Sequence, residues 1–80
     1  MLYLGISQLA IGESQNSIST LSTVEKNSKK RVIVEYAQWF KALAYLKTEN
    51  ISEAKSILLE FSSKPNSDFY KEASTLLDAL

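Results

Sequence analysis

One short stretch of the sequence has the residue spacing of a nucleophilic site. Ser52 and Lys55 fit the pattern S-x-x-K, in which a lysine lies one helical turn from a serine nucleophile. The K-T-G motif that accompanies this pattern in enzymes is absent, since Glu49 follows Lys47 and Thr48 where glycine is required. We therefore interpret this stretch as an ordinary helix start and predict that the chain has no catalytic residues.

Two pairs of acidic residues have the spacing of metal ligands. Glu49 and Glu53 are four residues apart, as are Asp68 and Glu72, so each pair would share one face of a helix. A cation such as calcium requires about six to eight oxygen ligands, and no loop rich in Asp and Asn supplies the others. Acidic side chains near the start of a helix also complement its dipole. We predict no metal site and no bound cofactor.

The composition excludes further classes of site. The 80 residues include no cysteine and no histidine, which excludes disulfides, the usual zinc sites and Ser-His or Cys-His nucleophile pairs. Nine basic and nine acidic residues give a net charge of zero, which argues against capture of nucleic acid. No stretch approaches the ~20 apolar residues of a membrane span, so this segment is not predicted to insert into a membrane. We predict that the chain is not an enzyme.

The hydrophobic pattern predicts an all-α fold. Ile18, Leu21 and Val24 recur every three residues and form one apolar stripe, while Gly12 is placed where a helix ends. The run from Val32 to Val34 resembles a strand, but the periodicity that follows it favours a helix. The predicted helices cover about residues 2–11, 15–26, 32–48, 51–61 and 67–80.

Local signals predict how the last two helices begin. Asn50 is followed three residues later by Glu53, which is the spacing of a capping box. Ser67 or Asn66 is expected to cap the final helix. The face of that helix predicted to be buried consists of Ala73, Leu76, Leu77 and Leu80.

A helix–turn–helix pattern occurs twice, with a constant separation of 37 residues. Ser17 and Ala54 are equivalent in this alignment, and both are small residues placed where two helices would approach closely. The apolar residues that follow also match, because Leu21 is equivalent to Leu58 and Val24 to Phe61. We therefore divide the single domain, residues 1–80, into unit one (about 1–28), unit two (about 31–63) and a capping helix (about 67–80).

This pattern resembles the tetratricopeptide repeat family over nearly the whole chain. In the first unit, Leu4-Gly5 is similar to the Leu-Gly of the family's first helix, and Gly12 to its turn glycine. In the second unit, the matching residues of the family pattern are Ala42, Tyr45, Ala54, Phe61 and, displaced by a few residues, Pro65. The stretch around Trp39 and Phe40 is similar to C-terminal repeats of bacterial proteins of this type.

Several positions depart from the family's pattern. Gln8 stands at the place of the usual tyrosine in unit one, while Lys41 and Glu49 replace a leucine and the turn glycine in unit two. The separation of 37 exceeds the family's period of about 34 residues, so the loop at Asn27–Arg31 is longer. These departures weaken the match at individual positions but leave the alternation of helices intact.

The resemblance implies a fold and a function. The fold would be a short right-handed solenoid of stacked antiparallel hairpins, and the function would be binding of another protein or peptide as a scaffold, in a concave groove or by self-association. Trp39 and Phe40 have a second interpretation, as packed core between the helices. The candidate partner-binding residues are Tyr3, Ile6, Tyr36, Trp39, Phe40, Leu43 and Lys47.

The first helix raises a question about oligomerisation. Met1–Gly12 carries no charge, so the outer face of this helix is expected to be covered by further repeats or by a second copy of the chain. An alternative function is therefore a structural one, in which the chain is the C-terminal cap or spacer of a longer, membrane-anchored or soluble, bacterial repeat protein. Cytoplasmic and periplasmic locations are both compatible with the sequence.

Overall fold

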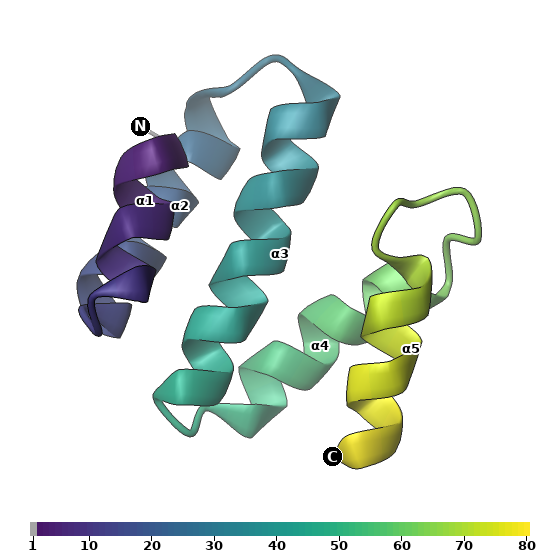
Figure 1. Ribbon diagram of the computed structural model, residues 1–80. Helices are drawn as coiled ribbons and strands as arrows, with labels where there is room; N and C mark the ends of the chain where they lie inside the picture. Colours follow the sequence, from purple (N-terminus) through teal and green to yellow (C-terminus); the bar gives the residue numbers. More distant parts are fainter. Residues whose placement is uncertain (1) are drawn as a thin grey trace.

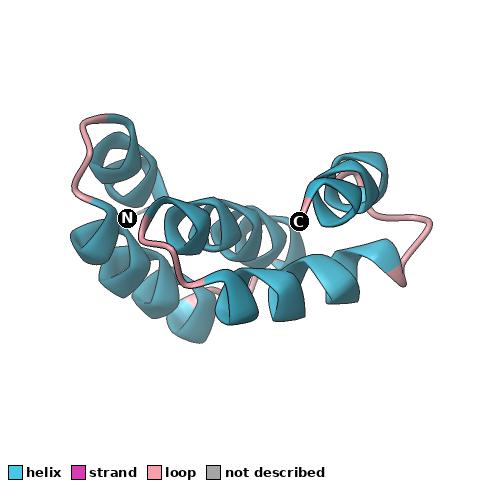
Figure 2. Ribbon diagram, turned by 90° about the horizontal axis from the view of Figure 1, so that it is seen from below, coloured by secondary structure: helices cyan, strands magenta, loops and turns pink. Residues whose placement is uncertain are grey.

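The computed structural model describes residues 2–80 and confirms the all-α class (Figure 1). Helix and loop account for all of residues 2–80 in Figure 2, so the apolar run from Val32 to Val34 is helical as predicted. Met1, the first residue of the predicted unit one, lies outside the described residues. The helices are α1 (Leu2–Ala10), α2 (Ser14–Asn27), α3 (Arg31–Lys47), α4 (Ile51–Ser62) and α5 (Tyr70–Ala79).

The helices follow one another across a flattened molecule. Each helix packs against the next in the chain, and α1 also packs against α3. The α1–α2 pair lies at one end and α5 at the other, with α3 and α4 between them (Figure 1). The principal extents of 29 × 28 × 17 Å show that the molecule is broad in two directions and about one helix pair thick in the third.

The turn between α1 and α2 and the turn between α3 and α4 have matching backbone geometry. Gly12 ends α1 with a φ of 88°, and Glu49, at the equivalent position after α3, has a φ of 64°. In each turn the amide of the next residue donates to the carbonyl five residues earlier at 2.8 Å. This is the hydrogen-bond pattern of a left-handed helix C-cap. Position 49 therefore keeps the turn conformation although glutamate has replaced glycine.

Small residues bring the paired helices together. The Ser17 hydroxyl donates to the Gly5 carbonyl at 2.6 Å, and Ser17 is fully buried. A Cβ atom added at Gly5 would lie 2.5 Å from the Leu21 side chain, so α1 and α2 are in direct contact there. In the second pair the equivalent residues Ala42 and Ala54 are also fully buried. Both hairpins thus pack through a small residue on each helix.

The core has two parts that share Phe40. One part, around Leu21, Val24 and Ala37, holds α2 against α3. The other contains an aromatic cluster, in which the Trp39 ring is stacked on Phe69 with centroids 4.8 Å apart. The Phe61 ring meets both of these rings edge-on. Phe40 packs against both parts and so connects the two hairpins.

Three local predictions were wrong. The Asn50 side chain makes no capping bond to α4, and its side-chain nitrogen donates to the Thr48 hydroxyl at 2.8 Å. The last helix begins at Tyr70 and not near Ser67, since residues 65–69 form turns. Leu80 is 44% exposed, because α5 ends at Ala79 before this side chain reaches the core.

Candidate functional site

An apolar groove lies between α1 and α3, the two helices that begin the hairpins. It has a volume of about 380 Å³ and is open to solvent along its length. The wall from α1 and the wall from α3 are both apolar, and Lys47 is the single charged residue of the lining. The lining residues are Ile6, Leu9 and Ala10 from α1, and Phe40, Leu43, Leu46 and Lys47 from α3.

Helical spacing accounts for this lining. Leu9 and Ala10 lie three and four positions after Ile6, and Phe40, Leu43 and Lys47 follow one another at steps of three and four, so each set forms one stripe of its helix. The two stripes are equivalent under the separation of 37 residues, since Ile6 matches Leu43 and Leu9 matches Leu46. The two equivalent helices therefore place equivalent apolar side chains on one surface, and these side chains form the groove lining.

The charge of the groove is concentrated at one end. Lys47 is exposed in the last turn of α3, where a cation complements the helix dipole. Within residues 2–80 this ammonium group has no ion-pair partner. The groove therefore offers apolar contacts along most of its length and one cation at its end.

Four of the seven predicted binding residues line this groove, namely Ile6, Phe40, Leu43 and Lys47. Tyr3 does not: its side chain is 85% exposed and borders a second hollow, at the start of α1. Leu9, Ala10 and Leu46 line the groove but were not among the candidates. The equivalence of Leu9 and Leu46 in the repeat was the signal that could have identified two of them.

Tyr36 and Trp39 belong to a different environment. The Trp39 side chain is 8% exposed and lies in the aromatic cluster, so the packed-core interpretation describes it better than a groove contact does. Tyr36 contacts Phe69 edge-on at 5.2 Å and remains 37% exposed. Both side chains thus contact Phe69, the residue before α5, and neither lines the groove.

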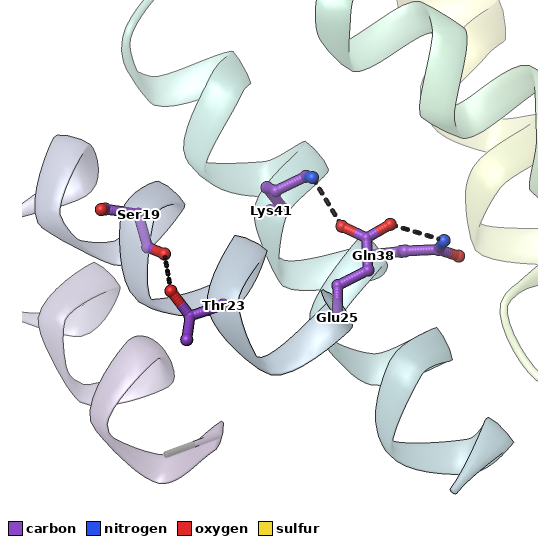
Figure 3. A network of polar contacts seen from close by, with 5 residues as sticks. All are labelled: Ser19, Thr23, Glu25, Gln38 and Lys41. Atoms are coloured by element: carbon purple, nitrogen blue, oxygen red, sulfur yellow. Dashed lines mark hydrogen bonds and ion pairs between the residues drawn. The ribbon is translucent and has the colours of Figure 1, made fainter. Parts of the chain in front are cut away.

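A polar network fixes α3 against α2 beside the core. Lys41 donates to one carboxylate oxygen of Glu25 at 2.6 Å, and Gln38 donates to the other at 2.8 Å (Figure 3). Burial raises the pKa of Glu25, but the hydrogen bonds from Lys41 and Gln38 and the charge of Lys41 outweigh it. The pKa of Glu25 therefore lies below its ordinary value. Both carboxylate oxygens are occupied, so this network is a structural link.

A second hollow lies at the far end of the α1–α2 pair. It has a volume of about 530 Å³, and its lining includes Leu2, Val24 and Ile33. Leu2 and Val24 are the equivalents of Trp39 and Phe61, which fill the corresponding space in the second hairpin with aromatic rings. Because the aliphatic side chains of the first hairpin are smaller, this space is only partly filled and the hollow remains.

The residues with potential chemistry are not assembled into a site. Ser52 and Lys55 are both exposed on α4. Across residues 2–80, acidic side chains do not gather in groups of three or more that could hold a metal ion. In the same range, every helix is too short or too polar to cross a lipid bilayer.

Comparisons with known proteins add no assignment. The chain matches no protein-family model, and neither the curated proteins nor the solved structures include a match.

Proposed function

We propose that the chain is a protein-interaction module that binds an apolar peptide or helix in the groove between α1 and α3. The observation that carries this proposal is the groove itself, whose lining is apolar apart from Lys47. When a partner helix covers such a groove, apolar surface is removed from water. Each Å² of apolar surface removed stabilises the complex by roughly 25 cal/mol. Anchors spaced three or four residues apart on an amphipathic helix match a groove of this kind.

The repeat character of the fold supports the same proposal. We infer that the two hairpins belong to a short solenoid of the tetratricopeptide repeat type. In such a fold the first helix of each unit lines the concave surface. The equal turn geometry at Gly12 and Glu49 supports this inference, as do the small residues buried at equivalent places in both hairpins.

A structural role is the second candidate. The α5 helix covers the second hairpin, and its residues Lys71, Glu72, Thr75 and Asp78 are exposed and polar. A polar outer face of this kind is what a terminal helix of a repeat protein requires. On this alternative the chain is the C-terminal cap of a longer bacterial repeat protein, and the groove has no ligand of its own.

A peptide-display experiment with a matched pair of variants separates the two candidates. The probe is a library of 20-residue amphipathic helical peptides with apolar residues at three- and four-residue spacing, selected on the immobilised chain. Ala10→Lys introduces a long charged side chain at an exposed position of the groove wall. Ser56→Lys introduces the same side chain at an exposed position of α4 outside the groove.

We expect selected peptides to lose at least tenfold in affinity for Ala10→Lys and to retain their affinity for Ser56→Lys. Fluorescence anisotropy measures the dissociation constants, and amide chemical shifts locate the bound peptide. Peptides that bind both variants equally, or a library from which nothing is enriched, would favour the structural role.

A further inference from the structure

The hollow at the end of the α1–α2 pair lacks a ring that its counterpart in the second hairpin contains. In the second hairpin, Phe69 stacks on Trp39 and meets Phe61 edge-on. The residue 37 positions before Phe69 is Val32, which is 61% exposed and does not line the hollow. Val32 already belongs to the first turn of α3, whereas Phe69 precedes α5. The first hairpin therefore has an open place where the second has an aromatic ring.

The lining of this hollow suits an aromatic side chain. Leu2, Val24 and Ile33 supply aliphatic surface from three different helices, and Tyr3 adds an aromatic side chain. The rest of the lining is polar but uncharged. Its volume of about 530 Å³ is within the range of binding pockets, about 300–1,000 Å³. An enclosed aromatic side chain buries about 150–250 Å² of surface, so one ring is a sufficient anchor for a ligand.

A run of positive charges adjoins the hollow. Asn27 and Ser28 belong to the lining, and the basic residues are their neighbours in the chain at the end of α2 and the start of α3. Figure 1 shows that the start of α1, the end of α2 and the loop to α3 lie at the same end of the molecule. We name these exposed residues the basic run, which consists of Lys26, Lys29, Lys30 and Arg31.

The charges of the basic run are available to a ligand. Within residues 2–80 its three lysines make no ion pair, and Arg31 is 3.9 Å from Glu35 with 85% of its side chain exposed. No acidic residue occurs between positions 26 and 31. The hollow thus combines an apolar interior with a positive border.

The fold itself does not require the basic run. Its equivalents in the second hairpin, 37 positions later, include no basic residue; they are Ser63, Asn66, Ser67 and Asp68. That hairpin nevertheless has the same helix pairing and a filled aromatic cluster. The open hollow and the positive charges therefore occur together in the first hairpin, which points to a ligand that has both a ring and negative charge.

A peptide segment fits these features better than a small anion or a lipid surface. A single exposed ion pair contributes little, so cations spread over residues 26–31 are most effective against several carboxylates at once. A lipid surface offers anionic headgroups but no ring that enters a hollow between three helices. The chain itself contains a segment of the required kind, because Asp68 directly precedes the ring of Phe69.

We propose that the hollow and the basic run form a second binding site, which takes an acidic segment of a partner protein through one aromatic side chain. The ring lies in the hollow against Leu2, Val24 and Ile33, and carboxylates on either side of it pair with the basic run. The proposal does not rest on the groove between α1 and α3, because the two linings have no residue in common.

The probe that tests this site is a fluorescein-labelled peptide with a central phenylalanine, flanked on each side by aspartate and glutamate residues. Two matched peptides have alanine in place of the phenylalanine, or serine in place of every acidic residue. Fluorescence anisotropy at about 50 mM salt gives the dissociation constants, since exposed charges are little screened under this condition.

Two pairs of protein variants complete the test. Leu2→Trp places in the hollow the side chain that its equivalent, Trp39, contributes to the filled cluster, and Leu59→Trp adds the same side chain at a 58% exposed position of α4. Lys29→Glu combined with Lys30→Glu reverses part of the basic run. Its control makes the same change of net charge at exposed positions elsewhere, through Lys55→Glu and Lys71→Glu.

We expect the alanine peptide to bind the unchanged chain at least tenfold more weakly than the phenylalanine peptide. Leu2→Trp and the reversal of the basic run are each expected to weaken the phenylalanine peptide at least tenfold, and their controls less than about threefold. The affinity should also fall as the salt concentration rises to about 500 mM. Circular dichroism establishes that each variant is folded, and the comparison of the two peptides on the unchanged chain stands without any variant.

Equal affinities for the phenylalanine and alanine peptides would overturn the proposal, because binding would then depend on charge alone. The absence of binding at peptide concentrations up to about 1 mM would overturn it as well. Vesicles of phosphatidylcholine with phosphatidylserine are the third probe. Cosedimentation with these vesicles, without binding of the peptide, would assign the basic run to a membrane surface and reject the peptide site.

Discussion

Single backbone positions carry much of the resemblance between the two hairpins. Gly12 and Glu49 have the same left-handed conformation, but only glycine adopts it without a steric cost. For other residues this region costs about 1–2 kcal/mol, because the Cβ atom approaches the following carbonyl. Glu49 is therefore held in place by the hydrogen bonds of its turn and by the packing of α3 on α4.

Replacing Glu49 by glycine should relieve this cost. We expect Glu49→Gly to raise the free energy of unfolding by about 1 kcal/mol, measured from urea titrations followed by circular dichroism. The matched control is Glu53→Gly, at an exposed position within α4, which should lower it by about 0.5–1 kcal/mol. Equal effects of the two changes would show that the backbone at position 49 is not strained.

Contacts between elements depend on one polar link as well as on apolar packing. Glu25 of α2 accepts hydrogen bonds from Lys41 and Gln38 of α3, and the Glu25 and Lys41 side chains are 28% and 16% exposed. The two hydrogen bonds to one carboxylate make this link stronger than an isolated exposed ion pair, which contributes about 0–1 kcal/mol. By contrast, Arg31 and Glu35 are 3.9 Å apart with Arg31 85% exposed, so that pair contributes little.

The link predicts a pH dependence. Because the pKa of Glu25 is lower in the folded chain than in the unfolded chain, its stabilisation is present above the unfolded value, about 4.3. It is lost as the pH falls through the folded value. We expect Glu25→Gln to lower the free energy of unfolding by about 1 kcal/mol at pH 7, with a smaller difference from the parent near pH 3. Glu60→Gln, at an exposed position of α4, is the control, and a pH-independent difference for Glu25→Gln would contradict the assignment.

The molecule as a whole is held at its C-terminal end by three aromatic rings. Trp39 comes from α3, Phe61 from α4, and Phe69 from the residue before α5. The α5 helix is short, with ten residues, and would be only marginally stable without such packing. This cluster therefore determines whether α5 stays packed on the second hairpin.

Removing one ring should detach α5 before the rest unfolds. We expect Phe69→Ala to lower the free energy of unfolding by about 3 kcal/mol and to speed amide exchange in α5 more than in α1 and α2. The Trp39 emission should shift to longer wavelength, because the stacked ring that shields it is gone. Leu59→Ala, at a 58% exposed position, is the control with little effect. Exchange that accelerates equally in all helices would indicate one cooperative unit.

The sequence alone determined the number, order and approximate bounds of the helices. Residue periodicity acts over three or four positions, and the turn residues lie next to the helices they end, so both signals are local. The sequence also identified Ser17 and Ala54 as equivalent small residues, and both are fully buried between the helices of their hairpins. Local signals failed at Asn50 and at the start of α5, because a side chain that can cap a helix can also bond within the preceding turn.

Only the tertiary structure decided which of the apolar side chains face solvent. Trp39 and Phe40 are neighbours on α3, yet one is closed off by Phe69 and the other reaches the groove. Adjacent residues of a helix point about 100° apart, so α3 itself places the two rings on different faces. Only the packing of Phe69, thirty positions away in the chain, decides that the face of Trp39 is the covered one. The exposed state of Tyr3 and Leu4 on α1 is likewise a property of what packs beside the helix, because burial depends on neighbours and not on residue type alone.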